Sequence, residues 1–326
     1  MPLPWNSPPL ADIEILTTGF LCLLALLVRA ATSLHPYSGE ATPPRFGDYE
    51  AHRHWMEVTL NLPARSWYVQ GPDNDLEYWG IDYPPLSAYL ARALASVAAC
   101  VEPGLVELHT SRGHETSSSR RFMRSTVLFT DALVYFPAAI AVARAAYPAG
   151  TRRRLAVALL VLQPALWIVD HGHFQYNCVS LGLALGATAF LIAPAGRGAL
   201  GAAVLFSLSL NFKQMSLYYA PAFFFAMFGR ALREQTLAGK ARHVACLGCV
   251  VICTFVVCWW PFLAQGAQGV AAVGARIFPV KRHIYEDKVA NLWCALSVVP
   301  PLKLRAKASP AQALRLSLAL VAASLA

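Results

Sequence analysis

The chain has 326 residues, of which 56% are hydrophobic and only 14% are charged. Soluble domains carry about 25% charged residues, and several apolar runs here approach the roughly twenty residues that a spanning helix needs. The net charge of +9 does not indicate nucleic acid, because the Arg and Lys residues stand in short loops between apolar runs. The composition excludes a soluble domain and a nucleic-acid module. It predicts an all-α polytopic membrane protein.

The N-terminal part of the chain predicts one span and one long loop. Residues 1–12 are Pro-rich and predict a short cytosolic tail, followed by a first transmembrane helix at residues 13–34. This apolar run is long and lacks a cleavage site, so we expect it to be retained as an anchor. A hydrophilic loop occupies residues 35–124. The remainder, residues 125–326, is a predicted transmembrane bundle with polar motifs in its loops.

The densest cluster of ionisable and aromatic residues follows the first span. Residues 46–57 read FGDYEAHRHWME. As a helix, this segment places Asp48, His52 and Trp55 on one face, at i, i+4 and i+7. A carboxylate beside cations and aromatics at the membrane surface is typical of a reaction site. The alternative is that Asp48 only caps a surface helix, a position that Asp favours.

A short apolar helix is predicted at residues 86–101, directly after the two prolines of the sequence GIDYPPL. The run is short for a span, and it carries Arg92 in its middle. A lone Arg at membrane mid-depth costs at least ~2.5 kcal/mol on insertion scales. We therefore expect the helix to lie on the membrane surface. Asp82, just before it, either assists the chemistry or caps the helix.

The later spans are predicted at residues 125–147, 155–169, 178–191, 199–210, 216–228 and 244–263, and another apolar helix opens near residue 314 and is still running at residue 326. Basic turns mark the cytoplasmic side, which assigns residues 152–154, residue 197 and residues 230–243 to that side. If the helix at residues 86–101 does not cross, every unusual polar motif falls on the opposite face. A shared site requires this grouping.

Polar motifs interrupt the bundle at three places. Residues 170–177 (DHGHFQYN) lie between two spans, where ionisable groups are expensive and usually functional. Two His and an Asp could bind zinc, but no further ligands stand nearby, which favours a hydrogen-bonding cage for a sugar or phosphate. Lys213, in the sequence NFKQM, either snorkels to the interface or meets a phosphate as a point charge. The charged loop at residues 278–288 is equally consistent with a solvated and a functional segment.

Five motifs together resemble one family, and they are GDYEAHRHW at residues 47–55, DYPP at 82–85, HGHFQYN at 171–177, FKQ at 212–214 and EDKVAN at 286–291. The family is that of the endoplasmic-reticulum glucosyltransferases that use dolichyl phosphate glucose. The resemblance runs in order from about residue 36 to residue 300. The Gly between the two His and the GDYE form of the first motif resemble the member that adds the first glucose. The member that adds the second glucose is the alternative.

The resemblance implies a GT-C fold with surface helices in the first lumenal loop, in a multi-pass protein of the endoplasmic-reticulum membrane with a lumenal site. It implies transfer of glucose from dolichyl phosphate glucose to the mannose arm of dolichyl-diphosphate Man9GlcNAc2, in an inverting α-1,3 reaction of the protein N-glycosylation pathway. The implied partners are these two lipid-linked substrates and membrane lipid, with no nucleic acid, cofactor or metal. Because family members have more transmembrane helices, we expect a C-terminally truncated form. An inactive isoform and a polytopic transporter are the open alternatives.

The resemblance also implies roles for individual residues. The general base of the family, an acidic residue in the first lumenal loop, corresponds to Asp48. The leaving phosphate departs without a general acid, and Lys213, Arg282 and the loop with His171 and His173 are the candidates to hold it. The expected substrate contacts are Glu50, Arg53, His54, Trp55, Asp82, Asp170, His171, His173, Gln175, Asn177, Lys213, Arg282 and Glu286.

Overall fold

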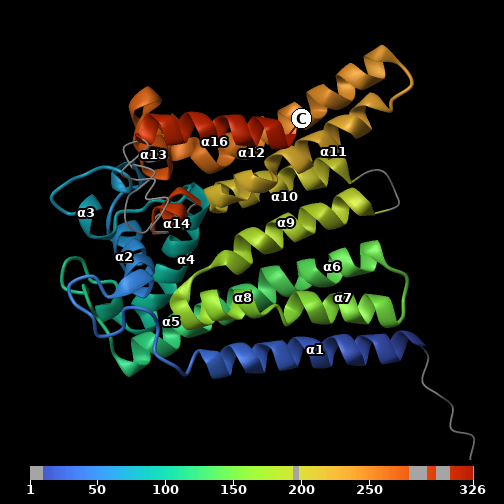
Figure 1. The fold of residues 1–326 in the computed structure, drawn as a ribbon. Coiled ribbons are helices and arrows are strands. Elements are labelled where there is room, and N and C mark those ends of the chain that lie inside the picture. The colour runs from blue at the N-terminus through green and yellow to red at the C-terminus, as the bar shows by residue number, and fades with distance from the viewer. Residues whose placement is uncertain (1–9, 194–197, 279–291, 299–308, 326) are drawn as a thin grey trace, which may run out of the picture. The chain divides into compact units, whose positions relative to one another are not determined.

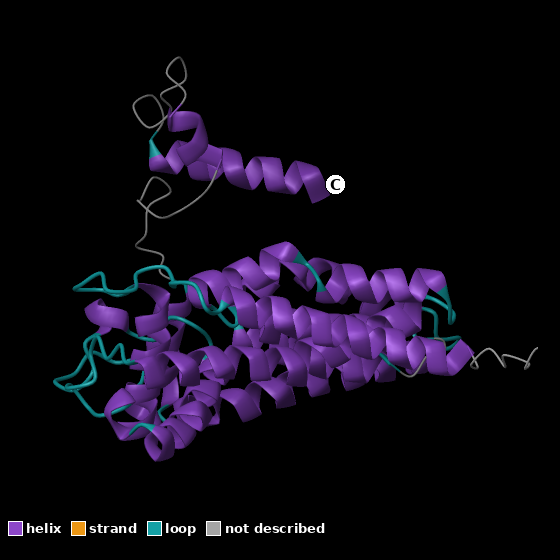
Figure 2. Ribbon diagram, turned by 90° about the horizontal axis from the view of Figure 1, so that it is seen from below, coloured by secondary structure: helices purple, strands orange, loops and turns teal. Residues whose placement is uncertain are grey.

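The computed structural model describes residues 10–193, 198–278, 292–298 and 309–325. The chain divides into two units, Met1–Ile277 and Phe278–Ala326, and each is described by itself. Among the described residues the regular elements are all helical, apart from one isolated bridge between Gly71 and Asn74 (Figure 2). This confirms the predicted all-α class.

The α-helices of the first unit are α1 (Leu10–Thr32), α2 (Gly47–Asn61), α3 (Leu76–Trp79), α4 (Pro85–Val101), α5 (Ser117–Thr130), α6 (Phe136–Ala146), α7 (Thr151–Val161), α8 (Pro164–Trp167), α9 (Asn177–Ile192), α10 (Ala199–Phe212), α11 (Ala220–Leu232), α12 (Leu237–Leu263) and α13 (Gly266–Ile277). Short 3₁₀ turns are η1 (Ala64–Ser66), η2 (Pro103–Leu105) and η5 (Gln214–Tyr219). Two π-helical segments are η3 (Asp131–Tyr135) and η4 (Ile168–Phe174). In the second unit, α14 (Leu292–Val298) and α16 (Pro310–Leu325) are joined by a hydrogen bond from Trp293 Nε1 to Ser317 Oγ (2.7 Å).

Four helical segments in the described residues are long and apolar enough to cross a membrane, namely Asp12–Thr32, Ser117–Ala146, Thr151–Phe174 and Leu237–Leu263. Each overlaps a predicted span. The shorter apolar helices α9 and α10 fall where spans were predicted at residues 178–191 and 199–210. The segment predicted as a span at residues 216–228 differs, because it begins within η5 and becomes α-helical only at Ala220.

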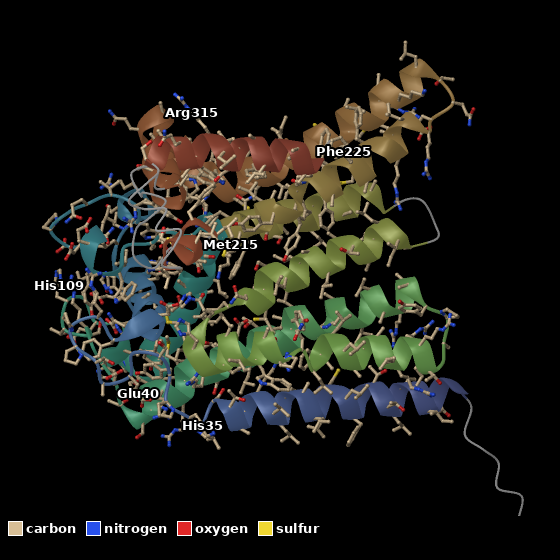
Figure 3. The ribbon with its side chains drawn as sticks, viewed as in Figure 1. His35, Glu40, His109, Met215, Phe225 and Arg315 are labelled. Atoms are coloured by element: carbon tan, nitrogen blue, oxygen red, sulfur yellow. The ribbon has the colours of Figure 1, made fainter. Side chains whose placement is uncertain are left out.

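The polar segments of the first unit gather at one end of its long helices. The loop after α1 lies there with α2, α3 and α4, and the turns between α6 and α7 and between α11 and α12 lie at the opposite end (Figure 1). His35, Glu40 and His109 mark the first end in the side-chain view (Figure 3). This end is called the loop end below. In the part of the chain that the structure describes, the basic turns and the polar motifs therefore lie at opposite ends, as the count of crossings predicted; residue 197 and most of the charged loop at residues 278–288 lie outside it.

Helix α4 packs against α2, α10 and α12 at the loop end. Its small side chains Ala88, Ala91, Ala95 and Ala98 form the buried face, which lets the neighbouring backbones approach closely. Arg92, the reason for expecting a surface helix, is not a lone charge. Its Nη1 donates to the backbone carbonyls of residues 59 and 60 in the last turn of α2, where a cation is favourable.

A buried ion network fixes α2 within the loop. Nε and Nη2 of Arg53 donate to the two carboxylate oxygens of Glu50 (2.8 Å each), and Nη2 also donates to Glu57 Oε2 (2.7 Å). Nη1 reaches the carbonyl of Leu105, 3.0 Å away in the following segment. Burial alone would raise the pKa of Glu57, but the hydrogen bond with His54 and the charge of Arg53 lower it to about 2. Glu57 therefore stays ionised beside Arg53, and the network ties α2 to η2.

Candidate active site

Asp48 lies in the first turn of α2 and does not cap it. The helix begins at Gly47, and its N-cap is Phe46, from which no side-chain cap hydrogen bond is made. Gly47 has a φ of +71°, and a Cβ at this position would lie 2.0 Å from the carbonyl oxygen of Ser38. Only glycine fits this entry into the helix. The capping alternative for Asp48 is therefore wrong, and its carboxylate is free for another role.

The Asp48 carboxylate is held by one of its two oxygens. Nε2 of His173 lies 3.0 Å from Oδ2, and Nε2 of Gln175 donates to the same oxygen. Among the described residues no hydrogen bond ends on Oδ1. The side chains of Asp48 and His173 are 30% and 44% exposed. One oxygen is thus oriented by the protein, and the other is available to an incoming hydroxyl group.

Lys213, directly after α10, carries the second reactive group of the cluster. Its Nζ donates to Asn177 Oδ1 (2.7 Å) and Gln175 Oε1 (3.3 Å), and it lies 4.6 Å from the centre of the Tyr83 ring. In the part of the chain that the structure describes, no carboxylate lies within ion-pair distance of it. An ammonium has three donors, and two are used here. Among the described residues, its direct contacts are therefore neutral oxygens and an aromatic face, while the charges of Asp170 and Asp48 act on it from beyond ion-pair distance.

Gln175 connects these two groups. Its Nε2 donates to Asp48, and its Oε1 accepts from Lys213 and from the hydroxyl of Tyr83 (3.3 Å). Because a carboxylate can only accept and an ammonium can only donate, the orientation of the amide is fixed. The carboxylate and the cation are held at the two ends of one side-chain amide.

Aromatic rings pack behind Asp48 on the same face of α2. His52 lies 4.7 Å from the ring of Trp55 and 4.9 Å from that of Tyr176. Burial lowers the pKa of His52 to about 4, although the Asp48 charge acts in the opposite direction. His52 is therefore neutral at neutral pH. The prediction that Asp48, His52 and Trp55 share one face is confirmed.

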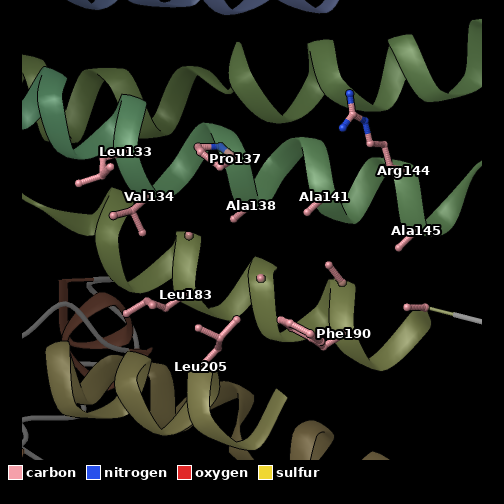
Figure 4. A pocket seen from close by; sticks show the side chains of 14 residues that line it. Leu133, Val134, Pro137, Ala138, Ala141, Arg144, Ala145, Leu183, Phe190 and Leu205 are labelled. Atoms are coloured by element: carbon pink, nitrogen blue, oxygen red, sulfur yellow. The ribbon is translucent and has the colours of Figure 1, made fainter. Parts of the chain in front are cut away.

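A separate cavity of about 660 Å³ lies between η3–α6 and α9 (Figure 4). Its lining is apolar, for example Leu133, Val134 and Phe190, and Arg144 is the one ionisable residue among the lining side chains. A cavity without a carboxylate, remote from the Asp48 segment, offers no base. The reactive groups converge at the loop end instead.

The profile of the ALG6, ALG8 glycosyltransferase family matches residues 21–323. The chain belongs to this family. It is 46% identical over 290 residues to the probable dolichyl pyrophosphate Man9GlcNAc2 alpha-1,3-glucosyltransferase of Arabidopsis thaliana, covering 87% of this chain and 53% of the relative. It is 45% identical over 283 residues to the rat enzyme of the same name, covering 86% and 55%. The chicken enzyme is 46% identical over 305 residues, covering 93% and 59%.

The chain thus spans about half the length of the curated relatives that it matches. As an ALG6, ALG8 family member it has the GT-C membrane fold that the motifs implied. The matched region includes Asp48, Gln175 and Lys213, so the whole cluster lies inside the segment shared with the family.

Four of the residues expected to contact substrate are buried within the loop after α1 and do not line an open site. Glu50, Arg53 and His54 are at most 1% exposed and belong to the ion network of α2. Trp55 is 4% exposed, and its Nε1 donates to the carbonyl of Trp79 (3.0 Å). In this structure these four side chains are therefore bonded within the loop and hold it together.

Two residues of the DHGHFQYN motif also have supporting positions. Asp170 is fully buried, and it accepts from Asn177 Nδ2 (2.8 Å) and from the backbone N–H of Cys178 (2.7 Å). It thereby caps the start of α9 and orients Asn177 toward Lys213. His171 is buried against Asp131, whereas His173 faces Asp48, so the two histidines do not share a ligand. The expected direct contact of Asp170 and His171 with substrate is corrected accordingly.

The remaining predicted residues divide by position. The backbone carbonyl of Asp82 accepts from Gln214 Nε2 (3.1 Å), and helix α4 begins without a side-chain cap, so Asp82 does not cap it. Arg282 and Glu286 lie outside the described residues. Sequence reasoning missed Tyr83, which contacts both Gln175 and Lys213. Its place in the DYPP motif, beside Asp82, was the available signal.

Proposed function

We propose that this chain carries the reaction site of an endoplasmic-reticulum glucosyltransferase, which moves glucose from dolichyl phosphate glucose to the mannose arm of dolichyl-diphosphate Man9GlcNAc2. The observation that carries the proposal is the Asp48 carboxylate, whose Oδ2 is bonded and whose Oδ1 has no partner among the described residues. Gln175 joins this carboxylate to the ammonium of Lys213. The names of the curated relatives specify the Man9GlcNAc2 acceptor and the α-1,3 linkage. Membrane lipid surrounds the spans, and the reaction site faces the lumen.

The chemistry is a single in-line displacement. Asp48 Oδ1 accepts the proton of the acceptor mannose hydroxyl. At the same time the oxygen of that hydroxyl bonds to C1 of glucose. The bond between C1 and the phosphate oxygen breaks, and its electron pair leaves with dolichyl phosphate. One displacement inverts the β linkage of the donor to an α linkage, with the base opposite the leaving group. The hydrogen bonds at Oδ2 orient the base throughout.

The leaving phosphate needs a fixed positive charge rather than a proton donor. The ammonium of Lys213 has one donor left beyond Asn177 and Gln175, and no carboxylate among the described residues pairs with it. A cation that is already oriented stabilises developing negative charge without reorganisation. Tyr83 and Gln175 keep the ammonium in place. In this proposal Asp48 supplies the base and Lys213 supplies the charge that stabilises the leaving phosphate.

The direct test is glucose transfer in membranes. Microsomes from cells that lack both the first and the second glucosyltransferase, supplied with this chain and labelled dolichyl phosphate glucose, are expected to glucosylate added dolichyl-diphosphate Man9GlcNAc2. Acceptor already carrying one glucose is expected to stay unlabelled, since the relatives act on Man9GlcNAc2. Lipid-linked product is measured by chromatography, with untransformed microsomes as the control.

Two outcomes would contradict this function. Labelling only of the acceptor that already carries one glucose would identify the chain as the second glucosyltransferase. Absence of labelling on both acceptors, with uptake of a labelled solute above the untransformed control, would favour the transporter alternative.

The lumenal position of the loop end gives a second expectation. Leu108→Asn creates the acceptor sequence Asn-His-Thr in the loop between η2 and α5, and Ala149→Asn creates Asn-Gly-Thr in the turn between α6 and α7. We expect microsomes to glycosylate the first variant and not the second, because the basic turn faces the cytoplasm. The measurement is a mobility shift that endoglycosidase removes. Glycosylation of the Ala149 variant with none of the Leu108 variant would reverse the topology.

A further inference from the structure

Three ionisable side chains meet inside the bundle, away from Asp48. Arg29 of α1 lies 2.9 Å from Asp131 (Nε to Oδ2), and Nε2 of His171 lies 2.5 Å from the same carboxylate oxygen. All three are 0% exposed. They come from three spanning segments, Asp12–Thr32, Ser117–Ala146 and Thr151–Phe174. These three residues are called the buried triad below.

The buried triad is poorly explained as a stabilising device. Ionisable groups in membrane spans are rare and usually mark functional positions. A buried ion pair gains stability only when its remaining polar atoms are satisfied. Here Nη2 of Arg29 and Oδ1 of Asp131 are buried without a partner among the described residues. The triad therefore costs free energy that apolar residues in the same positions would not.

Asp131 and His171 each lie in a π-helical segment. Asp131 begins η3, which joins α5 to α6, and His171 lies in η4, which ends the span that begins with α7. Single π turns inside helices occur frequently at functional sites. The two segments present their side chains to each other across the bundle, and Arg124 fixes η4 further by donating from Nη1 to the carbonyl of His171.

The segment that follows His171 contains the two residues that hydrogen-bond to Asp48, namely His173 and Gln175. Phe174, between His173 and Gln175, has a φ of +89° and is fully buried. A non-glycine residue in this region costs of order 1–3 kcal/mol and persists only where the surroundings hold it. Rings of Tyr49 and His52 hold the Phe174 side chain, 5.0 and 5.8 Å away between centroids. On the other side of Gly172, the buried triad holds His171.

We propose that the buried triad is a positioning unit, in which Arg29 and Asp131 anchor His171 so that the following strained turn presents His173 and Gln175 to Asp48. The catalytic consequence rests on the proposed glucosyltransferase function. The structural part does not, because it concerns the order of residues 171–178. In this arrangement Arg29 and Asp131 do not touch substrate, and they act through the geometry of the base.

The test removes both charges together, so that no unpaired ion remains. The double variant Arg29→Met, Asp131→Leu is compared with Glu14→Leu, Arg153→Met, which deletes the ion pair between Glu14 and Arg153 (2.7 Å). This control pair also starts from α1, but it joins α1 to α7 at the end remote from Asp48. Replacing a buried pair by apolar residues is usually neutral or stabilising, so both proteins should accumulate.

Two measurements are made on each variant in membranes. Amide hydrogen exchange at residues 171–178 reports the order of the turn, where Gln175 and Cys178 N–H groups are bonded to Asp170. Glucose transfer reports turnover and the KM for the acceptor. For the triad variant we expect ~10-fold faster exchange in this segment with α9 still protected. We expect turnover to fall about 10²-fold with the acceptor KM within about threefold of wild type. The control variant should match wild type in both.

The outcomes separate this inference from the proposed function. Unchanged exchange in the triad variant overturns the positioning role, whether or not the wild type transfers glucose. Faster exchange with wild-type turnover also overturns it, because Asp48 would then work without the ordered turn. If the wild type transfers no glucose, the proposed function fails and exchange alone decides the structural claim. Should the double variant not accumulate, Asp131→Asn, which keeps the side-chain shape, is judged by the same two measurements.

Discussion

Replacing Asp48 with asparagine is expected to lower glucose transfer by about 10²-fold or more, because the amide cannot take the proton of the acceptor hydroxyl. The structure makes this loss specific to the base. Asp48 is 30% exposed in its side chain, it caps no helix, and its Oδ1 has no partner among the described residues. Turnover is measured with labelled donor at saturating acceptor, beside the amount of protein in the membrane.

The fold should survive this change. An asparagine Oδ1 in the place of Oδ2 still accepts from His173 and Gln175, so the turn at residues 173–175 keeps its anchor. Asp73→Asn is the matched control, since Asp73 is half exposed in the same loop and, among the described residues, pairs only with His109. It should keep wild-type turnover. Near-normal transfer by Asp48→Asn, in a protein that is otherwise active, would remove Asp48 as the base.

The sequence was sufficient to find Asp48 and the helix face on which it lies. The spacing of Asp48, His52 and Trp55 placed them together on one side of a helix, and α2 has that geometry. The resemblance added Gln175 and Lys213, and the structure brings both to Asp48. Their meeting is a contact between α2, the start of α9 and the end of α10, which no periodicity within one segment can show.

The spacing of Glu50 and Arg53, two of the expected substrate contacts, already indicated ion pairs within their own helix. Glu50, Arg53 and Glu57 are spaced at i, i+3 and i+7 on one helix, which is the spacing of intrahelical ion pairs. That pattern predicts partners for Arg53 within its own helix. The N–H groups that bond to these carboxylates are not available to a substrate. The burial of the network could not be foreseen, because Leu105 and Ser111 approach it from a segment some fifty residues later.

The pairing of the buried triad was missed although Arg29 and Asp131 stood inside predicted spans and His171 in a polar motif directly after one. Arg29 and Asp131 interrupt apolar runs, and a single ionisable residue in such a run is a signal of function. What the sequence does not contain is the pairing. The π turn at η3 shifts the register of the helix after Asp131, and a pattern of 3.6 residues per turn does not describe it.

Lys213→Met is expected to reduce the kcat/KM of transfer by about 10²-fold, as the loss of one preorganised donor to a developing negative charge typically does. Methionine keeps the packing of the stem and removes the charge. Because the ammonium donates to Asn177 and Gln175, its loss leaves Asn177 Oδ1 without a partner among the described residues, at a cost of roughly 1–3 kcal/mol, whereas Gln175 Oε1 keeps the Tyr83 hydroxyl. Thermal unfolding of the purified protein measures that part separately. Lys240→Met, in the basic turn at the other end, is the control and should match wild type.

Inhibition by dolichyl phosphate separates a phosphate contact from a loss of structure. The released product carries the phosphate that Lys213 is expected to hold, so its inhibition constant should rise about tenfold or more in Lys213→Met, as the loss of one charge-assisted hydrogen bond implies. In Asp48→Asn, where the cation is intact, the affinity for dolichyl phosphate should remain at the wild-type value, measured by competition for labelled dolichyl phosphate. A Lys213→Met protein that is inhibited by dolichyl phosphate as strongly as wild type would show that the cation serves Gln175 and Asn177 alone. The leaving group would then have to be held by other residues.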